Sequence, residues 1–118
     1  MRRDPRAYLH DVIEAADSIA RFVGDSDRIR YESDALLQAG VERKFTIIGE
    51  ALSQLSKLYP DVAGRVARLR EISGFRNLLI HAYTSVDQRR VWTIMQQSLP
   101  ELRVSAKALL DDLSNQGS

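Results

Sequence analysis

The fold is decided by a segment of 22 residues, 37–58, which reads LQAGVERKFTIIGEALSQLSKL. Its large apolar residues recur at alternating four- and three-residue steps: Leu37, Val41, Phe45, Ile48, Leu52, Leu55 and Leu58. That spacing lines them along one side of an α-helix and predicts a packing seam. Pro60 then ends the helix, because proline has no backbone N–H to donate.

Gly49 interrupts this helix, at a cost of about 1 kcal/mol relative to alanine. Two interpretations are equally open. Either the glycine is tolerated without any role, or another backbone packs closely against the helix at that point.

A further helix is predicted over residues 5–23, ahead of the seam. Asp4 can cap its free amides, and Pro5 at the first helical position loses no hydrogen bond. Residues 25–34 are polar and charged, which predicts a loop or a frayed helix start. A shorter helix is predicted over residues 61–72.

The C-terminal third of the chain predicts one long helix. Residues 85–88 form a capping box, with a hydroxyl at the cap and an amide three residues later. Apolar residues then recur from Val91 to Leu113, and residues 114–118 form a frayed tail. No stretch alternates as a strand does, so the predicted fold is all-α, an antiparallel bundle of four to five helices.

The length and composition are those of one small domain, residues 1–118. There are no cysteines, which excludes disulfides and thiolate metal sites. The N-terminus lacks the apolar region of a signal peptide, and no apolar run reaches the ~18 residues of a membrane span. We therefore expect a cytoplasmic protein. Its net charge of +1 argues neither for nor against nucleic acid.

Most of the usual catalytic motifs are missing from the sequence. It has no His-Glu-x-x-His, no Walker-type loop and no Gly-x-Ser-x-Gly. It has two histidines, His10 and His81, so a metal site would need carboxylates in a geometry that the sequence does not suggest. His10 is interpreted as an ordinary surface histidine.

Residues 76–83, RNLLIHAY, contain the best candidates for chemistry. His81 can gain or lose a proton near neutral pH, and Arg76 can stabilise the growing charge of a phosphate. Metal-free RNA cleavage needs both functions, since a 2′-hydroxyl loses a proton and a pentavalent phosphorane forms. By spacing alone, however, a histidine at a helix end bonded to a backbone carbonyl is the favoured interpretation. The apolar run 78–80 covers more than one helical face, so burial on several sides is expected.

This segment resembles the R-x4-H-x-Y signature of the HepT-like branch of the HEPN ribonucleases. Further blocks resemble that family in the same order and cover nearly the whole chain: residues 1–9, 47–51, 59–60, 70–72, and 86–87 followed by 91–92. One departure is visible. The family often has tryptophan where this chain has Leu69, which we interpret as a packing change, although it could alter the groove beside the site.

The resemblance implies a metal-independent endoribonuclease without a cofactor, the toxin of a type VII-like toxin–antitoxin pair. It makes Arg76 and His81 the catalytic pair acting on RNA. It also implies that a minimal nucleotidyltransferase antitoxin transfers AMP to the motif tyrosine, Tyr83. Asn77 is polar within an apolar run, and we assign it a supporting role in orienting the phosphate or the histidine.

Helical geometry favours a homodimer. At ~100° per residue, positions five apart lie ~140° apart, so an undistorted helix turns His81 away from Arg76. Either the helix ends near His81, or two chains build the site across a two-fold axis. The resemblance implies the second arrangement.

Two other functions compete with the enzyme. One is a non-catalytic helical dimer that docks a nucleotidyltransferase and helps to bind its substrate; the intact Arg76 and His81 favour the enzyme over it. The other is a plain structural bundle, which explains the core but not the polar residues within the apolar segment 76–83.

Overall fold

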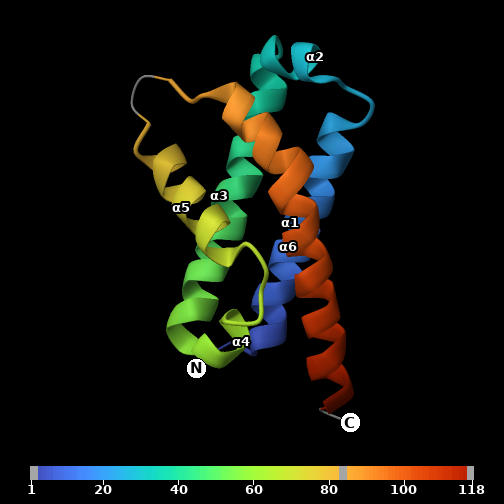
Figure 1. Cartoon of the computed structure of the whole chain (residues 1–118), viewed down its shortest axis with the longest axis vertical. Coiled ribbons are helices and arrows are strands. Elements are labelled where there is room, and N and C mark those ends of the chain that lie inside the picture. The colour runs from blue at the N-terminus through green and yellow to red at the C-terminus, as the bar shows by residue number, and fades with distance from the viewer. Residues whose placement is uncertain (1–2, 83–84, 117–118) are drawn as a thin grey trace.

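The computed structural model describes residues 3–82 and 85–116, and within these ranges all regular structure is helical. The helices are α1 (Pro5–Val23), α2 (Arg28–Glu32), α3 (Ala35–Leu58), α4 (Pro60–Ala63), α5 (Leu69–Ile80) and α6 (Gln88–Gln116). The four longest alternate in direction along the bundle (Figure 1), which confirms the all-α, antiparallel prediction. The described part has six helices rather than four to five, because two very short helices join the long ones.

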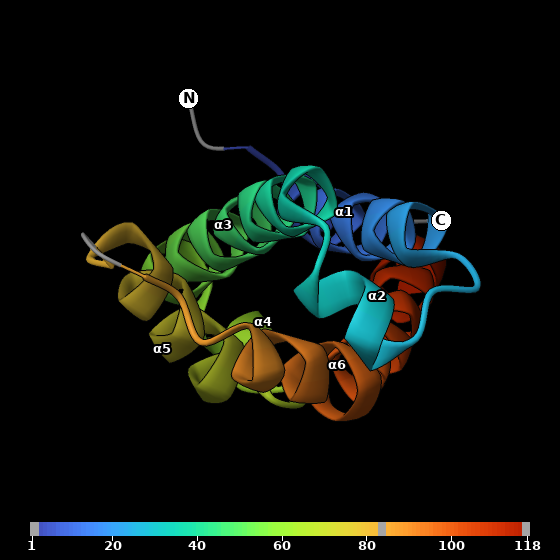
Figure 2. The same cartoon turned by 90° about the horizontal axis from the view of Figure 1, so that it is seen from above.

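The predicted seam on α3 is the centre of the core. Val41, Phe45, Ile48, Leu52 and Leu55 are fully buried, each stabilising the fold by about 1.5–3 kcal/mol through loss of apolar surface from water. Seen from above, α3 lies between α1 and α5, and α6 closes the other side (Figure 2). The seam therefore packs against α1 on one side and against α5, the helix with the candidate catalytic residues, on the other.

Helix α1 has the predicted bounds, and its ends have local causes. The Asp4 side chain accepts a hydrogen bond from the Arg6 N–H at 2.9 Å, which caps the first turn. Gly24 has a φ of +52°, a conformation that side-chain-bearing residues rarely adopt, and it ends the helix.

Residues 28–32 form a helix where the sequence predicted a loop or a frayed helix start. The reason is Tyr31, which is fully buried, packs on Trp92 of α6 with ring centroids 5.7 Å apart, and so fixes the short helix on the bundle. Asp27 caps it by accepting the Arg30 N–H at 2.8 Å.

The predicted helix over 61–72 is wrong. Helix α4 ends at Ala63, Arg68 adopts a left-handed φ of 65°, and α5 begins only after it. Helix α5 then continues through Gly74, because Ile72 and Phe75 are buried on either side of the glycine. The Phe75 ring meets Phe45 edge-on, with centroids 5.2 Å apart, so packing against α3 outweighs the weak helix propensity of glycine.

The predicted capping box at 85–88 is also wrong. Helix α6 begins at Gln88, and Asp87 caps it by accepting the N–H groups of Arg89 and Arg90 at 3.1 and 3.3 Å. The Gln88 side chain bonds to other helices instead. At the other end the helix extends to Gln116, so the described part of the predicted tail is helical.

Candidate active site

Helix α5 presents the candidate catalytic residues and ends at one of them. Arg76 and Asn77 lie within the helix, and His81 is its C-cap, with φ −105° and ψ 8°. The His81 N–H donates to the Asn77 carbonyl oxygen at 3.3 Å, which closes the last turn. The motif spacing allowed a helix that ends near His81, and the structure shows such an end. The angle of ~140° between Arg76 and His81 that an undistorted helix would give therefore does not apply.

Arg76 lies directly against the backbone of α3. A Cβ added at Gly49 would overlap the Cβ and Cγ of Arg76 and lie 3.1 Å from its Nε. Gly49 is therefore the place of a close approach, as one of the two interpretations required, but the group that approaches is a side chain rather than a backbone. Glycine is needed here because any larger residue would displace the arginine.

The guanidinium of Arg76 has no hydrogen-bond partner among the described residues. Its Nε is buried and makes no hydrogen bond to any described residue. Nor does any described carboxylate form an ion pair with it. A buried donor left unpaired is unfavourable by about 1–3 kcal/mol, and no described residue removes this cost at the Arg76 Nε.

His81 faces a different part of the surface. It is exposed and lines a hollow of about 340 Å³ between the end of α5 and the start of α6. The other residues of the hollow are Phe75, Leu78, Leu79, Ala82, Ser85, Val86, Asp87 and Arg90. Arg76 is not among them. A single chain thus brings His81 and Arg90 to one hollow and leaves Arg76 on the side of α5 that faces α3.

The remaining site residues of the sequence prediction are Asn77 and Tyr83. Asn77 is exposed one position after Arg76, and its backbone carbonyl accepts the cap bond from His81. Its side chain makes no hydrogen bond to another described residue, so its supporting role stays a prediction. Tyr83 lies outside the described residues.

The apolar run 78–80 is not buried on several sides, as the sequence suggested. Leu78 is 54% exposed and Ile80 is 46% exposed, while Leu79 packs partly against the core. Helix α5 borders mainly α3 and, less extensively, α6, which it meets at the hollow beside His81 and through the Ser98–Glu71 hydrogen bond, so one chain leaves its outer face uncovered. Two large apolar side chains are thereby exposed within two positions of the candidate catalytic residues.

Most of the described arginines fall into two groups. Six form ion pairs with carboxylates: Arg3, Arg6, Arg28, Arg65, Arg68 and Arg103. Six others have side chains with no hydrogen bond or ion pair to any described residue: Arg30, Arg43, Arg70, Arg76, Arg89 and Arg90. Two of this second group are close to the motif: Arg76 belongs to it and Arg90 shares a hollow with His81, so positive charge without a described partner lies there although the net charge is only +1.

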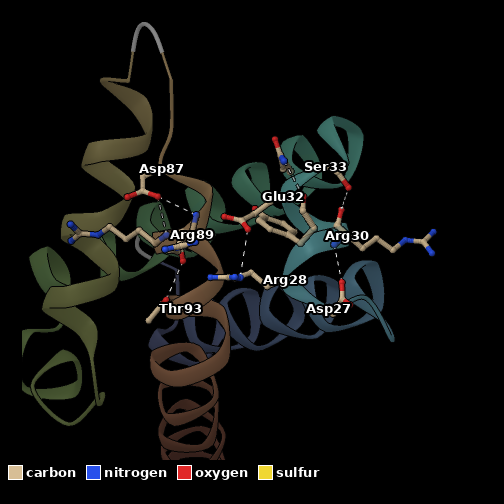
Figure 3. Close-up of polar contacts among 11 residues, drawn as sticks. Asp27, Arg28, Arg30, Glu32, Ser33, Asp87, Arg89 and Thr93 are labelled. Atoms are coloured by element: carbon tan, nitrogen blue, oxygen red, sulfur yellow. Dashed lines mark hydrogen bonds and ion pairs between the residues drawn. The ribbon is translucent and has the colours of Figure 1, made fainter.

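The start of α6 is fixed by a chain of two hydrogen bonds. The Tyr31 hydroxyl donates to Gln88 Oε1 at 2.7 Å, and Gln88 Nε2 donates to Glu42 Oε2 at 2.8 Å. Burial and the neighbouring Glu42 raise the pKa of Tyr31, so the hydroxyl keeps the proton that it donates. Figure 3 shows Asp87 against the first turn of α6 and Arg28 beside Glu32, whereas the Arg30 side chain extends away from these contacts.

Two other kinds of site, a metal centre and one built on His10, find no support among the described residues. Within residues 3–82 and 85–116, no three His, Cys, Asp or Glu side chains are grouped as metal ligands would be. His10 is a surface residue, as predicted, and lies 3.7 Å from Glu14. No helix in these ranges is both long and apolar enough to cross a membrane.

Comparison with known proteins decides the family. The model of the family "Ribonuclease HepT-like" matches residues 12–109. The chain belongs to this HepT-like family. One relative is "Putative RNase MJ0125" of Methanocaldococcus jannaschii, 29% identical over 116 residues, which cover 95% of this chain and 96% of the relative. Another is "Probable ribonuclease HepT" of Thermococcus cleftensis, 32% identical over 107 residues, 87% of this chain and 93% of the relative. No solved structure matches the chain significantly.

The family membership confirms the resemblance that residues 76–83 suggested. One residue of the site, Arg90, was not predicted from the sequence. Arg90 shares the hollow with His81, but it lies outside the motif, and its sole signal in the sequence is the pair of adjacent arginines at 89–90.

Proposed function

We propose that this protein is a metal-independent endoribonuclease in which Arg76 and His81 act together on one phosphate of RNA. The observation that carries the proposal is the Arg76 guanidinium, which is held on Gly49 with a buried Nε and no described partner. No hydrogen bond or ion pair joins the rest of the guanidinium to a described residue either, and an acceptor with two oxygens, such as a phosphate, would pair with its terminal N–H groups, since arginine binds phosphates through two parallel hydrogen bonds. Membership of a ribonuclease family supports RNA as the source of that phosphate.

The proposed reaction is an internal transesterification of one phosphodiester. The 2′-oxygen attacks the neighbouring phosphorus, its proton leaves to a base, and the bond to the 5′-oxygen breaks as that oxygen takes up a proton. His81 supplies the base or the acid, because imidazole exchanges protons near neutral pH. Arg76 stabilises the negative charge of the phosphorane. The products are a 2′,3′-cyclic phosphate and a free 5′-hydroxyl.

The proposal includes a two-fold homodimer. Within one chain Arg76 and His81 do not line the same hollow, and Leu78 and Ile80 are exposed beside them. A second copy packed on this face would bury both apolar side chains and bring two sets of Arg76 and His81 to a shared cleft. Sedimentation at micromolar concentration is expected to give twice the monomer mass of 13.4 kDa. A stable monomer that cleaves RNA would contradict this arrangement.

The central test uses purified protein, total RNA and EDTA. Wild-type protein should cleave under these conditions, and His81→Ala should lose about 10²–10⁴-fold in rate, the usual contribution of a general acid or base. His81 is exposed, so the variant should keep its helical content, measured by circular dichroism. Cleavage at an unchanged rate by folded His81→Ala would end the assignment. A wild-type protein that binds but never cleaves RNA would favour the non-catalytic docking dimer.

The regulatory part of the proposal concerns Tyr83. We propose that the protein is the cytoplasmic toxin of a two-gene pair, and that a minimal nucleotidyltransferase silences it by transferring AMP to the Tyr83 hydroxyl with release of pyrophosphate from ATP. The added phosphate would compete with RNA for arginine, and the adenosine would obstruct the cleft. Tyr83→Phe should retain cleavage but escape silencing by the co-expressed transferase. Mass spectrometry that finds silencing without AMP on Tyr83 would refute this step.

A further inference from the structure

The hollow beside His81 has a composition suited to one nucleotide. Its apolar part is formed by Phe75, Leu78, Leu79 and Val86, and its polar groups are His81, Ser85, Asp87 and Arg90. Its volume of about 340 Å³ lies within the range of ~300–1,000 Å³ typical of small-ligand sites. An apolar surface with few polar groups is what a nucleobase attached to a charged phosphate requires.

Arg90 is the cation of this hollow, and its charge is available. It is exposed and forms no ion pair with any described carboxylate. The acidic residue that shares the hollow is Asp87, whose Oδ1 accepts the N–H groups of Arg89 and Arg90. This carboxylate is stabilised by the positive end of α6, so it acts as a helix cap and not as a partner of the Arg90 guanidinium.

The backbone that carries Arg90 is anchored firmly. Gln88 is bonded to both Tyr31 and Glu42, and the next residue after Arg90, Val91, is fully buried. The Thr93 hydroxyl donates to the Arg89 carbonyl at 3.1 Å within the same turn. The guanidinium is therefore presented from a fixed helix start, which lowers the entropy lost when it binds a ligand.

We propose that this hollow is a nucleotide subsite for the RNA substrate, in which Arg90 binds the phosphate and the apolar side chains cover the base. The inference rests on the proposed function, because it is His81 at the edge of the same hollow that links the subsite to the cleaved bond. The nucleotide it holds is the one beside that bond. Arg90 acts in binding and takes no part in proton transfer.

Arg89 is a matched control for Arg90. Both are exposed arginines in the first turn of α6, both have backbones bonded to Asp87, and only Arg90 lines the hollow. The probe is a 12-residue, fluorescein-labelled 2′-O-methyl RNA of mixed sequence, which lacks the attacking hydroxyl and cannot be cleaved. Binding is measured by fluorescence anisotropy over a series of KCl concentrations.

Arg90→Gln is expected to weaken binding at least tenfold, and to lower the slope of log Kd against log salt by about 0.7 for each phosphate that the protein no longer neutralises. Arg89→Gln should match the wild type in affinity and in the slope against salt. Arg90→Lys should restore the slope but not the full affinity, since lysine is a point charge without the two-pronged geometry. In cleavage of natural RNA, Arg90→Gln should raise KM and leave kcat nearly unchanged.

The outcomes separate this inference from the proposed function. If Arg90→Gln and Arg89→Gln behave alike, the subsite is refuted even where the wild type cleaves RNA. If Arg90→Gln alone loses affinity but the wild type never cleaves, the subsite stands and the ribonuclease proposal fails. Absence of binding by the wild type refutes the subsite, whereas the ribonuclease proposal is decided by the cleavage assay alone. Loss of dimer mass in Arg90→Lys would show that the hollow is filled by a second copy and overturn the inference.

Discussion

Two arginines that reach from one helix to another show how differently this fold uses the same side chain. Arg103 on α6 reaches Asp17 on α1 through hydrogen bonds of 2.9 and 3.2 Å, and the bonded arginine lowers the pKa of that carboxyl. Arg76 on α5 reaches α3, where it meets the bare backbone of Gly49 and no described carboxylate. The first arginine joins two helices, whereas the second is positioned by the fold and has no described partner, which is why we propose that it binds a ligand.

The same difference extends to the surrounding charges. Arg65 and Arg68 connect the segment between α4 and α5 to the last turns and the middle of α6, through Asp112 and Glu101 respectively. At the motif and in the hollow beside His81, Arg76 and Arg90 have no such partners among the described residues. Positive charge is thus neutralised where helices are tied together and left open where a polyanion is proposed to bind.

The largest effect should come from replacing each of these two inter-helix arginines with methionine, which keeps an apolar stem. Arg76→Met should lower kcat for RNA cleavage by about 10²–10³-fold, the usual loss when a stabilising donor is removed. Arg103→Met should cleave at nearly the wild-type rate. Cleavage assays on both, with circular dichroism as a check on folding, test the contrast. Equal losses in the two variants would show that the two arginines do not differ in role.

A smaller effect separates Gly49 in α3 from Gly74 in α5. Gly49→Ala forces a Cβ against Arg76, and we expect destabilisation by about 1–3 kcal/mol, reduced by the gain of up to about 1 kcal/mol in helix propensity. A Cβ at Gly74 would meet nothing within 4 Å, so Gly74→Ala should stabilise the chain by about 0.5–1 kcal/mol.

Urea unfolding measures both glycine variants. Gly49→Ala should also impair cleavage, because the arginine stem must move. If alanine at position 49 raises the free energy of unfolding as alanine at 74 does, then Arg76 is not held by α3 in the way described.

The smallest effect is the pH dependence of the Asp17–Arg103 pair. Its two side chains are 41% and 38% exposed, so Arg103→Met should lower the free energy of unfolding at neutral pH by at most about 1 kcal/mol. The pKa of Asp17 is lowered in the folded state from its ordinary 3.8, so the stabilisation is present above that value. It disappears as the pH falls through the lowered pKa.

Urea titrations of the wild type and Arg103→Met at neutral pH and near pH 2.5 test this linkage. The two unfolding curves should approach each other in acid. A difference that persists or grows in acid would mean that Arg103 stabilises the protein by packing rather than through Asp17.

The sequence predicted what depends on local repetition and missed what depends on distant contacts. The seam of α3 and the bounds of α1 follow from apolar spacing and from Asp4 and Pro5. Helix α2 could not be predicted, since it depends on the burial of Tyr31 against Trp92, 61 positions away. The start of α5 was misplaced because the left-handed Arg68 is not visible in the residue pattern.

The residues of the candidate site also separate into those that the sequence predicted and those that it missed. Arg76 and His81 were found because they lie in one short segment that resembles a family signature. That Gly49 and Arg76 are neighbours depends on the packing of α5 on α3, so the sequence left two interpretations of the glycine open. Arg90 was missed because its place beside His81 exists only once α6 returns to the end of α5.

The sparse anchoring of α5 has a consequence for hydrogen exchange. Only Ile72 and Phe75 of its described side chains are buried, against nine residues of α1. Amides of α5 should therefore exchange through a local opening whose free energy is well below that of global unfolding. An oligonucleotide bound by Arg76 would link α5 to α3 and slow this exchange. The helix with the proposed catalytic residues would then open more readily than α1 in the free protein and gain protection in the complex.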